Sequence, residues 1–271
     1  MYCQYYSLKE RPFNITPDPK YLFLSPQHQD AFNHLWFGVT ERKGFIQLTG
    51  EVGCGKTTLC RGLLDKLEES KYSTALVLNP VMTENQMLMT ILNEFGIVKK
   101  GRGRARNYEL LNNFLLEKAK EEKEALLIID EAQDLTTELL EFVRLLSNLE
   151  TDNQKLLQVI LVGQPELKEK INDPAIRQLR QRITVRFHLE KLSLQETQRY
   201  IEYRMNIAGA NGIPYFEKGA LKKIHRYAGG IPRLINAVAD RALLAGYVHG
   251  SYNITGKLVR QAEKELEGNF K

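Results

Sequence analysis

The feature that most constrains this chain is an eight-residue motif of the form G-x-x-x-x-G-K-[ST], made of Gly50, Glu51, Val52, Gly53, Cys54, Gly55, Lys56 and Thr57. A short run of apolar, β-type residues (45–49) precedes it, and a helical pattern (57–69) follows it. Glycines in such a strand–loop–helix unit let backbone N–H groups approach phosphate oxygens, and the helix N-terminus adds the positive end of its dipole. The motif therefore predicts a phosphate-binding loop rather than an ordinary turn.

The side chains of this loop predict a nucleotide that arrives with a metal ion. We expect Lys56 to reach the β- and γ-phosphates and the Thr57 hydroxyl to join a magnesium shell, with Thr58 counted among the binding residues. Cys54 fits the loop as a small residue, and a redox switch is the alternative interpretation. The chain has three cysteines, and they lack a paired spacing, which argues against a disulfide framework or a zinc site.

A second motif supplies carboxylates. The apolar run 125–129 ends in Asp130 and Glu131, and the carboxyl ends of strands are where ligands of open α/β sheets bind. We expect Asp130 to hold magnesium through water and Glu131 to act as the general base on the attacking water. A solvated turn is the alternative, but a phosphate-binding loop earlier in the chain favours the catalytic interpretation.

Strand and helix patterns alternate through the first two thirds of the chain. The expected strands are 45–49, 73–79, 125–129, 156–162 and 184–189. The helices expected between them are 57–69, 84–95, 108–122 and 138–150. Nearly continuous apolar runs are typical of parallel strands buried on both faces. We therefore expect an α/β fold, a RecA-like P-loop NTPase core whose parallel sheet is flanked by helices.

After residue 192 the sequence predicts only helices, at 193–208, 217–227, 231–248 and 255–267. Ser193 and Glu196 form a capping box at the first of them. Pro232 begins another helix, so Arg233 lies near a helix N-terminus, where the dipole does not favour its charge. A cation in that position hints at a ligand phosphate. This part reads as a separate all-helical lid.

Three more side chains are candidates for the site. Gln164 follows the fourth strand, where it would lie beside the water and the γ-phosphate; a helix-entry turn is the alternative. Arg180 and Arg182 flank one residue just before the fifth strand, and guanidinium groups suit phosphate oxygens. An arginine from a neighbouring subunit would stabilise transition-state charge, with Arg182 the first choice and Arg180 the second. Surface arginines at a helix end are the alternative.

Composition sets broad limits. The apolar fraction of 43% and charged fraction of 26% are those of a soluble globular protein. No apolar run reaches the roughly 18–20 residues of a membrane span, and the first residues lack the apolar stretch of a signal peptide, so we expect a cytoplasmic protein. The net charge of +5 permits contact with nucleic acid without demanding it.

Taken in order, these elements resemble the AAA+ superfamily of oligomeric ATPases, and more closely the general secretion pathway protein A family of the ExeA type. The resemblance covers nearly the whole chain. It is carried by the segments 5–22, 44–58, 130–135, 163–167 and 229–236. The opening segment, Tyr-Tyr-Ser-Leu-Lys-Glu-Arg-Pro-Phe-Asn-Ile-Thr-Pro-Asp-Pro-Lys-Tyr-Leu, is the most specific of them.

The resemblance implies ATP rather than GTP, magnesium dependence, a ring or helical homo-oligomer, and Arg233 as a sensor in the lid. It also implies that the arm near Pro17–Leu24 packs by the adenine. The expected domains are 1–43 (an arm and helix packing on the nucleotide site), 44–191 (the P-loop AAA+ core) and 192–271 (the lid). Family members with a membrane span and a cell-wall-binding domain carry them after the ATPase; this chain ends at Lys271, so we expect a stand-alone form.

Two hypotheses for the biological process remain open at this stage. The first is a motor or switch for assembly of a secretion, pilus or exopolysaccharide export system, peripheral at the inner membrane through partners. The second is a DNA-binding regulator of transposition, favoured by the basic loop Lys99–Arg106, although basic loops are often merely solvated. A metabolic kinase would use the same phosphate-binding loop, but the core-plus-lid plan with arginines suited to a partner's site speaks against it.

Overall fold

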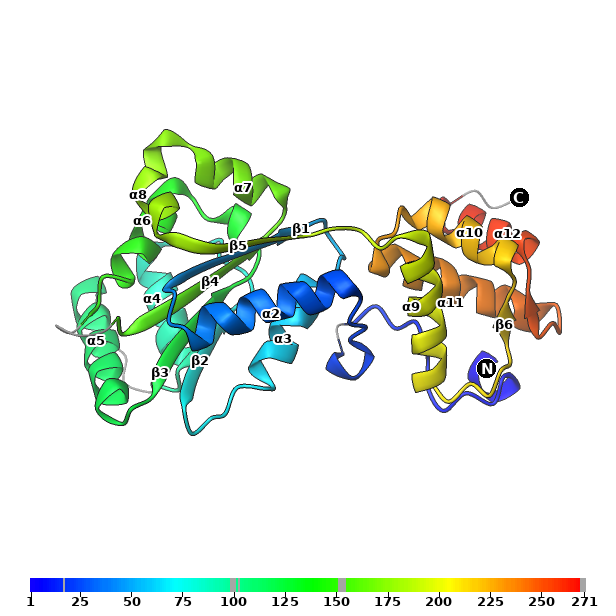
Figure 1. Cartoon of the computed structure of the whole chain (residues 1–271), viewed down its shortest axis with the longest axis horizontal. Helices are drawn as coiled ribbons and strands as arrows, with labels where there is room; N and C mark the ends of the chain where they lie inside the picture. The colour runs from blue at the N-terminus through cyan, green and yellow to red at the C-terminus, as the bar shows by residue number, and fades with distance from the viewer. Residues whose placement is uncertain (17, 98–100, 102, 151–154, 269–271) are drawn as a thin grey trace. The chain divides into compact units, whose positions relative to one another are not determined.

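Five parallel strands form the sheet of this protein (Figure 1). The computed structural model describes residues 1–16, 18–97, 101, 103–150 and 155–268. The chain divides into two compact units, which are described separately below. The sheet unit consists of Gln29–Gly50 and Leu59–Leu189, and the helical unit consists of Met1–His28, Glu51–Thr58 and Glu190–Lys271.

The strands of the sheet unit follow the order β2-β3-β4-β1-β5, and all neighbouring pairs are parallel. Their bounds are β1 (Phe45–Gly50), β2 (Tyr72–Val77), β3 (Glu124–Ile129), β4 (Leu157–Gly163) and β5 (Ile183–Leu189). Every residue of β1 and of β4 is buried, as expected of central strands covered on both faces. This topology confirms the predicted RecA-like core.

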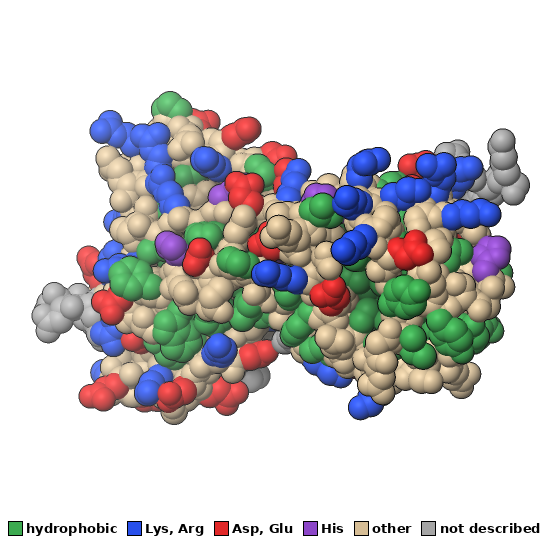
Figure 2. Space-filling view, turned by 45° about the vertical axis from the view of Figure 1, so that its right-hand side comes forward, with side chains coloured by type: hydrophobic (Ala, Val, Ile, Leu, Met, Phe, Trp, Pro, Cys, Tyr) green, Lys and Arg blue, Asp and Glu red, His purple; other side chains and the backbone are tan. Residues whose placement is uncertain are grey.

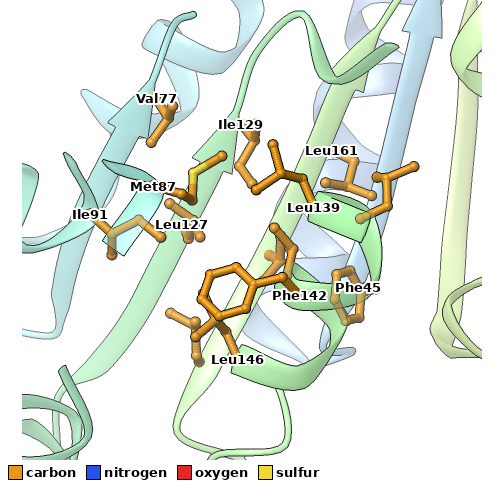
Figure 3. Close-up of a cluster of buried hydrophobic side chains, with 14 of the residues drawn as sticks. Phe45, Val77, Met87, Ile91, Leu127, Ile129, Leu139, Phe142, Leu146 and Leu161 are labelled. Atoms are coloured by element: carbon orange, nitrogen blue, oxygen red, sulfur yellow. The ribbon is translucent and has the colours of Figure 1, made fainter. Parts of the chain in front are cut away.

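Helices cover the sheet. They are α2 (Pro26–Thr40), α3 (Lys56–Leu64), α4 (Glu84–Glu94), α5 (Arg104–Lys120), α6 (Thr137–Leu146), α7 (Pro165–Asn172) and α8 (Arg177–Arg182). On one face, side chains of α4 to α7 pack with alternate strand residues. Figure 3 shows part of this core, where Met87 of α4 and Leu139 of α6 pack with Leu127 and Ile129 of β3. On the other, α2 lies so close to β1 that a Cβ on Gly38 would come within 2.5 Å of Ile46.

The helical unit contains α1 (Tyr2–Tyr5), α9 (Leu194–Ile207), α10 (Lys218–Ala228), α11 (Pro232–Val248) and α12 (Gly256–Leu266). Its core is built by these helices together with the N-terminal arm, whose Tyr6 and Phe13 are each 1% exposed. The buried Arg204 of α9 donates to the backbone oxygens of Pro12 and Asn14. These contacts attach the arm to the lid helices.

The structure corrects four expectations. The segment expected as one piece, 1–43, is divided, because residues 1–28 pack with the lid helices and 29–43 with the sheet. The lid is not wholly helical, since β6 (Tyr215–Phe216) and β7 (Asn253–Ile254) form a short parallel pair. Helix α5 begins at Arg104 rather than at 108. Two short helices, α7 and α8, occupy a region where helices were considered only as alternatives: Gln164 precedes α7, and Arg180 and Arg182 lie in the last turn of α8.

Candidate nucleotide site

The phosphate-binding loop has the backbone that its glycines predict. Gly53 and Gly55 have φ angles of 81° and 99°, in the left-handed region that favours glycine. Gly50 ends β1, and a Cβ there would lie 2.6 Å from the carbonyl oxygen of Leu189. Lys56, the first residue of α3, is only 7% exposed, and its Nζ donates to the Glu51 carbonyl at 3.0 Å. The loop is therefore an ordered turn around the lysine.

Cys54 is fully buried within this loop. Burial raises the pKa of its thiol, and the ammonium of Lys56 opposes that rise only in part. Since the thiolate is the reactive form of cysteine, a buried thiol with a raised pKa is chemically inert at neutral pH. The structure therefore favours the small-residue interpretation of Cys54 over a redox switch.

Arg233 contacts the loop within the helical unit. Its backbone N–H donates to the carbonyl of Gly53 at 3.2 Å. A Cβ on Gly53 would lie 2.6 Å from the Cβ of Arg233, so only glycine permits this approach. Pro232 and Arg233 form the first turn of α11, as the sequence predicts. The first turn of this lid helix is thus placed directly against the phosphate-binding loop.

The carboxylate pair lies where β3 ends. Asp130 is 4% exposed, and its carboxylate accepts the backbone N–H of Glu131 at 2.9 Å. Glu131 has a φ of 52°, a left-handed conformation that is uncommon for a residue with a side chain. Residues held in such conformations concentrate at functional sites, where the surrounding structure maintains them.

Two glutamines hold the Glu131 carboxylate. Gln133 donates to its Oε2 at 2.9 Å, and Gln164 donates to the same oxygen at 3.3 Å. The Oε1 atom of Gln133 in turn accepts the backbone N–H of Gln164 at 3.1 Å. Gly163 makes room for this network, because a Cβ there would lie 2.8 Å from Gln133 Oε1. Gln133 was not singled out from the sequence; its place two residues after Glu131 was the available signal.

The sheet order brings the polar ends of three strands to one edge. Asp130 and Glu131 follow β3, Gln164 follows β4 and Gly50 ends β1. These strands are neighbours in the order β3-β4-β1, and they are parallel. Their carboxyl ends therefore share the edge at which open α/β sheets bind ligands. The phosphate-binding loop leaves the sheet unit at this edge, directly after Gly50.

The two candidate arginines have contacts elsewhere in the sheet unit. Arg182 donates to the Oγ of Ser147, just after α6, at 3.0 Å. Arg180 reaches the carbonyl of Asn172, at the end of α7, at 3.4 Å. Both side chains are half-buried. Arg182 is thus the better anchored of the two, and Arg180 is free to move at the cost of one long hydrogen bond.

The basic segment Lys99–Arg106 lies partly outside the described residues. Within the described part, Arg104 pairs with Glu84 and Arg106 pairs with Glu109 at 2.7 Å. Both arginines belong to α5 rather than to a loop. Pro17, at one end of the arm expected near the adenine, also lies outside the described residues. In the described part of this arm, the ring centre of Phe23 lies 5.7 Å from the ring centre of Tyr200.

Few side chains are candidates for holding a metal ion. Across the described ranges, no group of three His, Cys, Asp or Glu side chains gathers to hold a metal ion. The helical unit offers the hydroxyl of Thr57, and the sheet unit offers the carboxylate of Asp130. Each is a ligand type that magnesium accepts, since this ion commonly takes only one or two carboxylates and completes its shell with phosphates and water. Among the described residues, no helix has both the length and the apolarity to cross a bilayer.

Comparison with known proteins agrees with the fold. Residues 39–171 match the family described as AAA domain. The chain is 45% identical over 269 residues to General secretion pathway protein A of Aeromonas hydrophila, an alignment that covers 99% of this chain and 49% of that protein.

Solved structures with the same fold include the ORC2 protein of Aeropyrum pernix in ADPNP–ADP complexes, with a TM-score of 0.70 and 20% identity over 95% of this chain and 72% of that one. CDC6P of Pyrobaculum aerophilum gives a TM-score of 0.68 and 18% identity, over 97% of this chain and 70% of that one. The Thermotoga maritima RuvB Holliday junction branch migration motor gives a TM-score of 0.57 and 18% identity, over 90% of this chain and 69% of that one.

The sheet order and the phosphate-binding loop give the chain the fold of a P-loop AAA+ core, and residues 39–171 match the AAA domain. Over nearly its whole length the chain is a homologue of general secretion pathway protein A, and it spans about half the length of that relative.

Proposed function

We propose that the protein binds ATP with magnesium and hydrolyses it to ADP and phosphate. The loop Gly50–Thr58 cradles the phosphates, Thr57 and Asp130 hold the metal ion, and Glu131 takes the proton of the attacking water. Arg233 senses the nucleotide from the lid. Magnesium would neutralise charge on the β- and γ-phosphates.

The observation that carries this proposal is the neighbouring order of β3, β4 and β1 in one parallel sheet. In this order the proposed base Glu131 and its partner Gln164 follow neighbouring strands, and they lie at the same edge of the sheet as Gly50, the last residue of β1. Glu131 is also held by two amide donors, which orient its carboxylate. A carboxylate in a fixed orientation is what a general base for water requires.

The experiment that tests nucleotide binding is a titration of the wild type and of Lys56→Ala with a fluorescent ATP analogue. Charge-assisted hydrogen bonds are worth roughly 1.5–3 kcal/mol each, so Lys56→Ala should bind ATP at least about tenfold more weakly. Lys66→Ala, which removes an exposed lysine after α3, is the matched control and should bind normally. Equal affinity in the wild type and Lys56→Ala would refute the proposal.

We further propose that hydrolysis takes place in a homo-oligomer, a ring or filament, in which Arg182 or Arg180 of one copy serves the nucleotide of the next. The biological process that fits the homologue's name is assembly of a secretion, pilus or polysaccharide export system, with the protein in the cytoplasm and peripheral at the inner membrane through its partners. Co-purification with export components, rather than with a transposase, would support this assignment.

A second candidate function, DNA binding, is favoured by a different surface from the one expected. Helix α10 presents exposed cations at every fourth residue, Lys218, Lys222 and Arg226, and α12 adds Lys257, Arg260 and Lys264. Figure 2 shows Lys and Arg side chains gathered on this part of the helical unit. Such stripes suit a phosphate backbone. Failure of the protein with ATP to bind duplex DNA at low salt would exclude this function.

A further inference from the structure

A buried serine–histidine pair contacts the backbone of the phosphate-binding loop. The Ser25 hydroxyl lies 2.8 Å from Nδ1 of His28, and it also accepts the backbone N–H of His28 at 3.3 Å. The other ring nitrogen of His28, Nε2, lies 3.0 Å from the carbonyl oxygen of Cys54. Ser25 is 1% exposed and His28 is 4% exposed. The three groups therefore form a buried series of hydrogen bonds.

The chemistry of these partners fixes the direction of the chain. A carbonyl oxygen only accepts, so Nε2 of His28 must carry the hydrogen that it donates to Cys54. In the neutral imidazole, Nδ1 is then an acceptor, and it takes the hydrogen of the Ser25 hydroxyl. Burial lowers the pKa of His28, which favours this neutral form. Ser25 thus selects the tautomer that can hold the loop.

The orientation of the Cys54 carbonyl also determines the orientation of the Gly55 N–H. The peptide bond between Cys54 and Gly55 is trans, so its C=O and N–H point in opposite directions. When the carbonyl points to His28, the N–H of Gly55 points to the opposite side of the loop. Gly55 has a φ of 99°, and a Cβ there would lie 3.3 Å from His28 Nε2. The positive φ favours glycine at this position, and an added Cβ would crowd the imidazole.

We propose that Ser25 and His28 are positioning residues of the phosphate-binding loop: they hold the Cys54 carbonyl so that the Gly55 N–H is presented to the phosphates of a nucleoside di- or triphosphate. The inference rests on the nucleotide binding proposed above. A pair that only filled the core would stabilise the fold and would have no particular effect on phosphate recognition. The distinguishing property is therefore a loss of affinity that depends on the phosphate groups of the ligand.

Three substitutions test the proposal in the intact chain. His28→Phe keeps a ring but removes the donor, His28→Gln keeps an amide donor near the position of Nε2, and Ser25→Ala removes the group that selects the tautomer. The loss of one hydrogen bond predicts about five- to tenfold weaker binding of ATP and ADP in His28→Phe, while competition by adenosine is unchanged. His28→Gln should recover affinity to within about threefold of wild type, and Ser25→Ala should fall between the two.

The outcomes separate this inference from the proposed function. If Lys56→Ala abolishes ATP binding while His28→Phe binds ATP like the wild type, the positioning role is refuted and nucleotide binding stands. Equal losses for ATP and adenosine in His28→Phe would also refute it, because they indicate a general structural effect. Should His28→Phe fail to fold, ring-nitrogen NMR of the wild type decides: hydrogen on Nε2 supports the proposal, and hydrogen on Nδ1 overturns it.

Discussion

The side-chain amide of Gln133 donates to the carboxylate of Glu131 at 2.9 Å. Through its oxygen the same amide accepts the backbone N–H of Gln164, so one side chain ties the proposed base to the neighbouring strand end. Lys170 fastens the backbone of this turn, since its ammonium donates to the carbonyls of Gln133 and Leu135 at 2.6 and 2.7 Å. The position of Glu131 is thus set by a network and not by its own conformational preference.

Replacing Gln133 by Met, which has similar length but no amide, should lower the turnover number roughly tenfold, because each lost hydrogen bond is worth about 0.5–1.5 kcal/mol. The affinity for ATP should not change, since the substitution leaves the phosphate-binding loop intact. Steady-state ATPase rates beside equilibrium binding measure the two quantities separately. The control is Gln198→Met on the exposed surface of α9, and a normal turnover number in Gln133→Met would contradict the role.

A methyl group at Gly163 should disturb the same network from the side of β4. Its Cβ would lie 2.8 Å from Gln133 Oε1 and 2.8 Å from Leu167 Cδ2. Overpacking of this kind typically costs about 1–3 kcal/mol, so Gly163→Ala should lower both the melting temperature and the turnover number. Gly219→Ala is a suitable control, because no atom lies within 4 Å of the added Cβ. An unchanged melting temperature in Gly163→Ala would mean that the end of β4 shifts to accommodate the methyl group, contrary to this prediction.

Acidification should weaken the fold through His28. Burial lowers the pKa of this histidine in the folded protein, while its hydrogen bond to Cys54 and the charge of Glu196 oppose the shift. The unfolded chain therefore binds the proton more readily. The stability contributed by neutral His28 is complete above the unfolded pKa of about 6.5, and it is lost as the pH falls below that value.

Denaturant unfolding of the wild type and of His28→Gln at several pH values checks this expectation. Glutamine does not titrate, so the difference between the two free energies of unfolding isolates the histidine. The wild type should lose stability relative to His28→Gln between pH 7.5 and 5. A difference that stays constant, or that moves in favour of the wild type on acidification, would contradict the assignment.

Shared catalysis between subunits predicts that ATPase activity per molecule rises with protein concentration. Arg182→Ala should bind ATP but turn over little by itself, because a trans-acting arginine is worth on the order of 10³-fold in rate. Mixing it with Lys56→Ala should restore some activity, since an intact loop then meets an intact arginine across one interface. Ser147→Ala controls for the loss of the contact that Arg182 makes within its own chain. Full activity of Arg182→Ala would shift the test to Arg180.

The sequence predicted the sheet well because its signals are local. Runs of apolar β-type residues gave all five strands to within about two residues, and the phosphate-binding motif fixed the loop between β1 and α3. Short helices were predicted less accurately. The ranges of α7 and α8 were not predicted, and α3 ends at Leu64, well before the expected residue 69. Short amphipathic turns carry too few apolar residues for a periodic pattern.

The parts of the site that escaped prediction act through tertiary contacts. His28 lies only three residues after Ser25, but its other partner, Cys54, is twenty-six positions away in sequence. The attachment of the arm to the lid depends on Arg204, which meets the carbonyl of Pro12 across the unit. No period or spacing encodes such pairs. A backbone carbonyl as acceptor leaves no trace in the residue types.

The most direct test of the account is the fate of ATP bound to Glu131→Gln. We predict that this variant binds ATP as tightly as the wild type yet converts it to ADP at least about 10²-fold more slowly in a single turnover, because an amide cannot accept the proton of water. Binding and hydrolysis should thereby separate in one protein. Conversion of bound ATP by Glu131→Gln at the wild-type rate would show that Glu131 is not the base, and the central claim would be wrong.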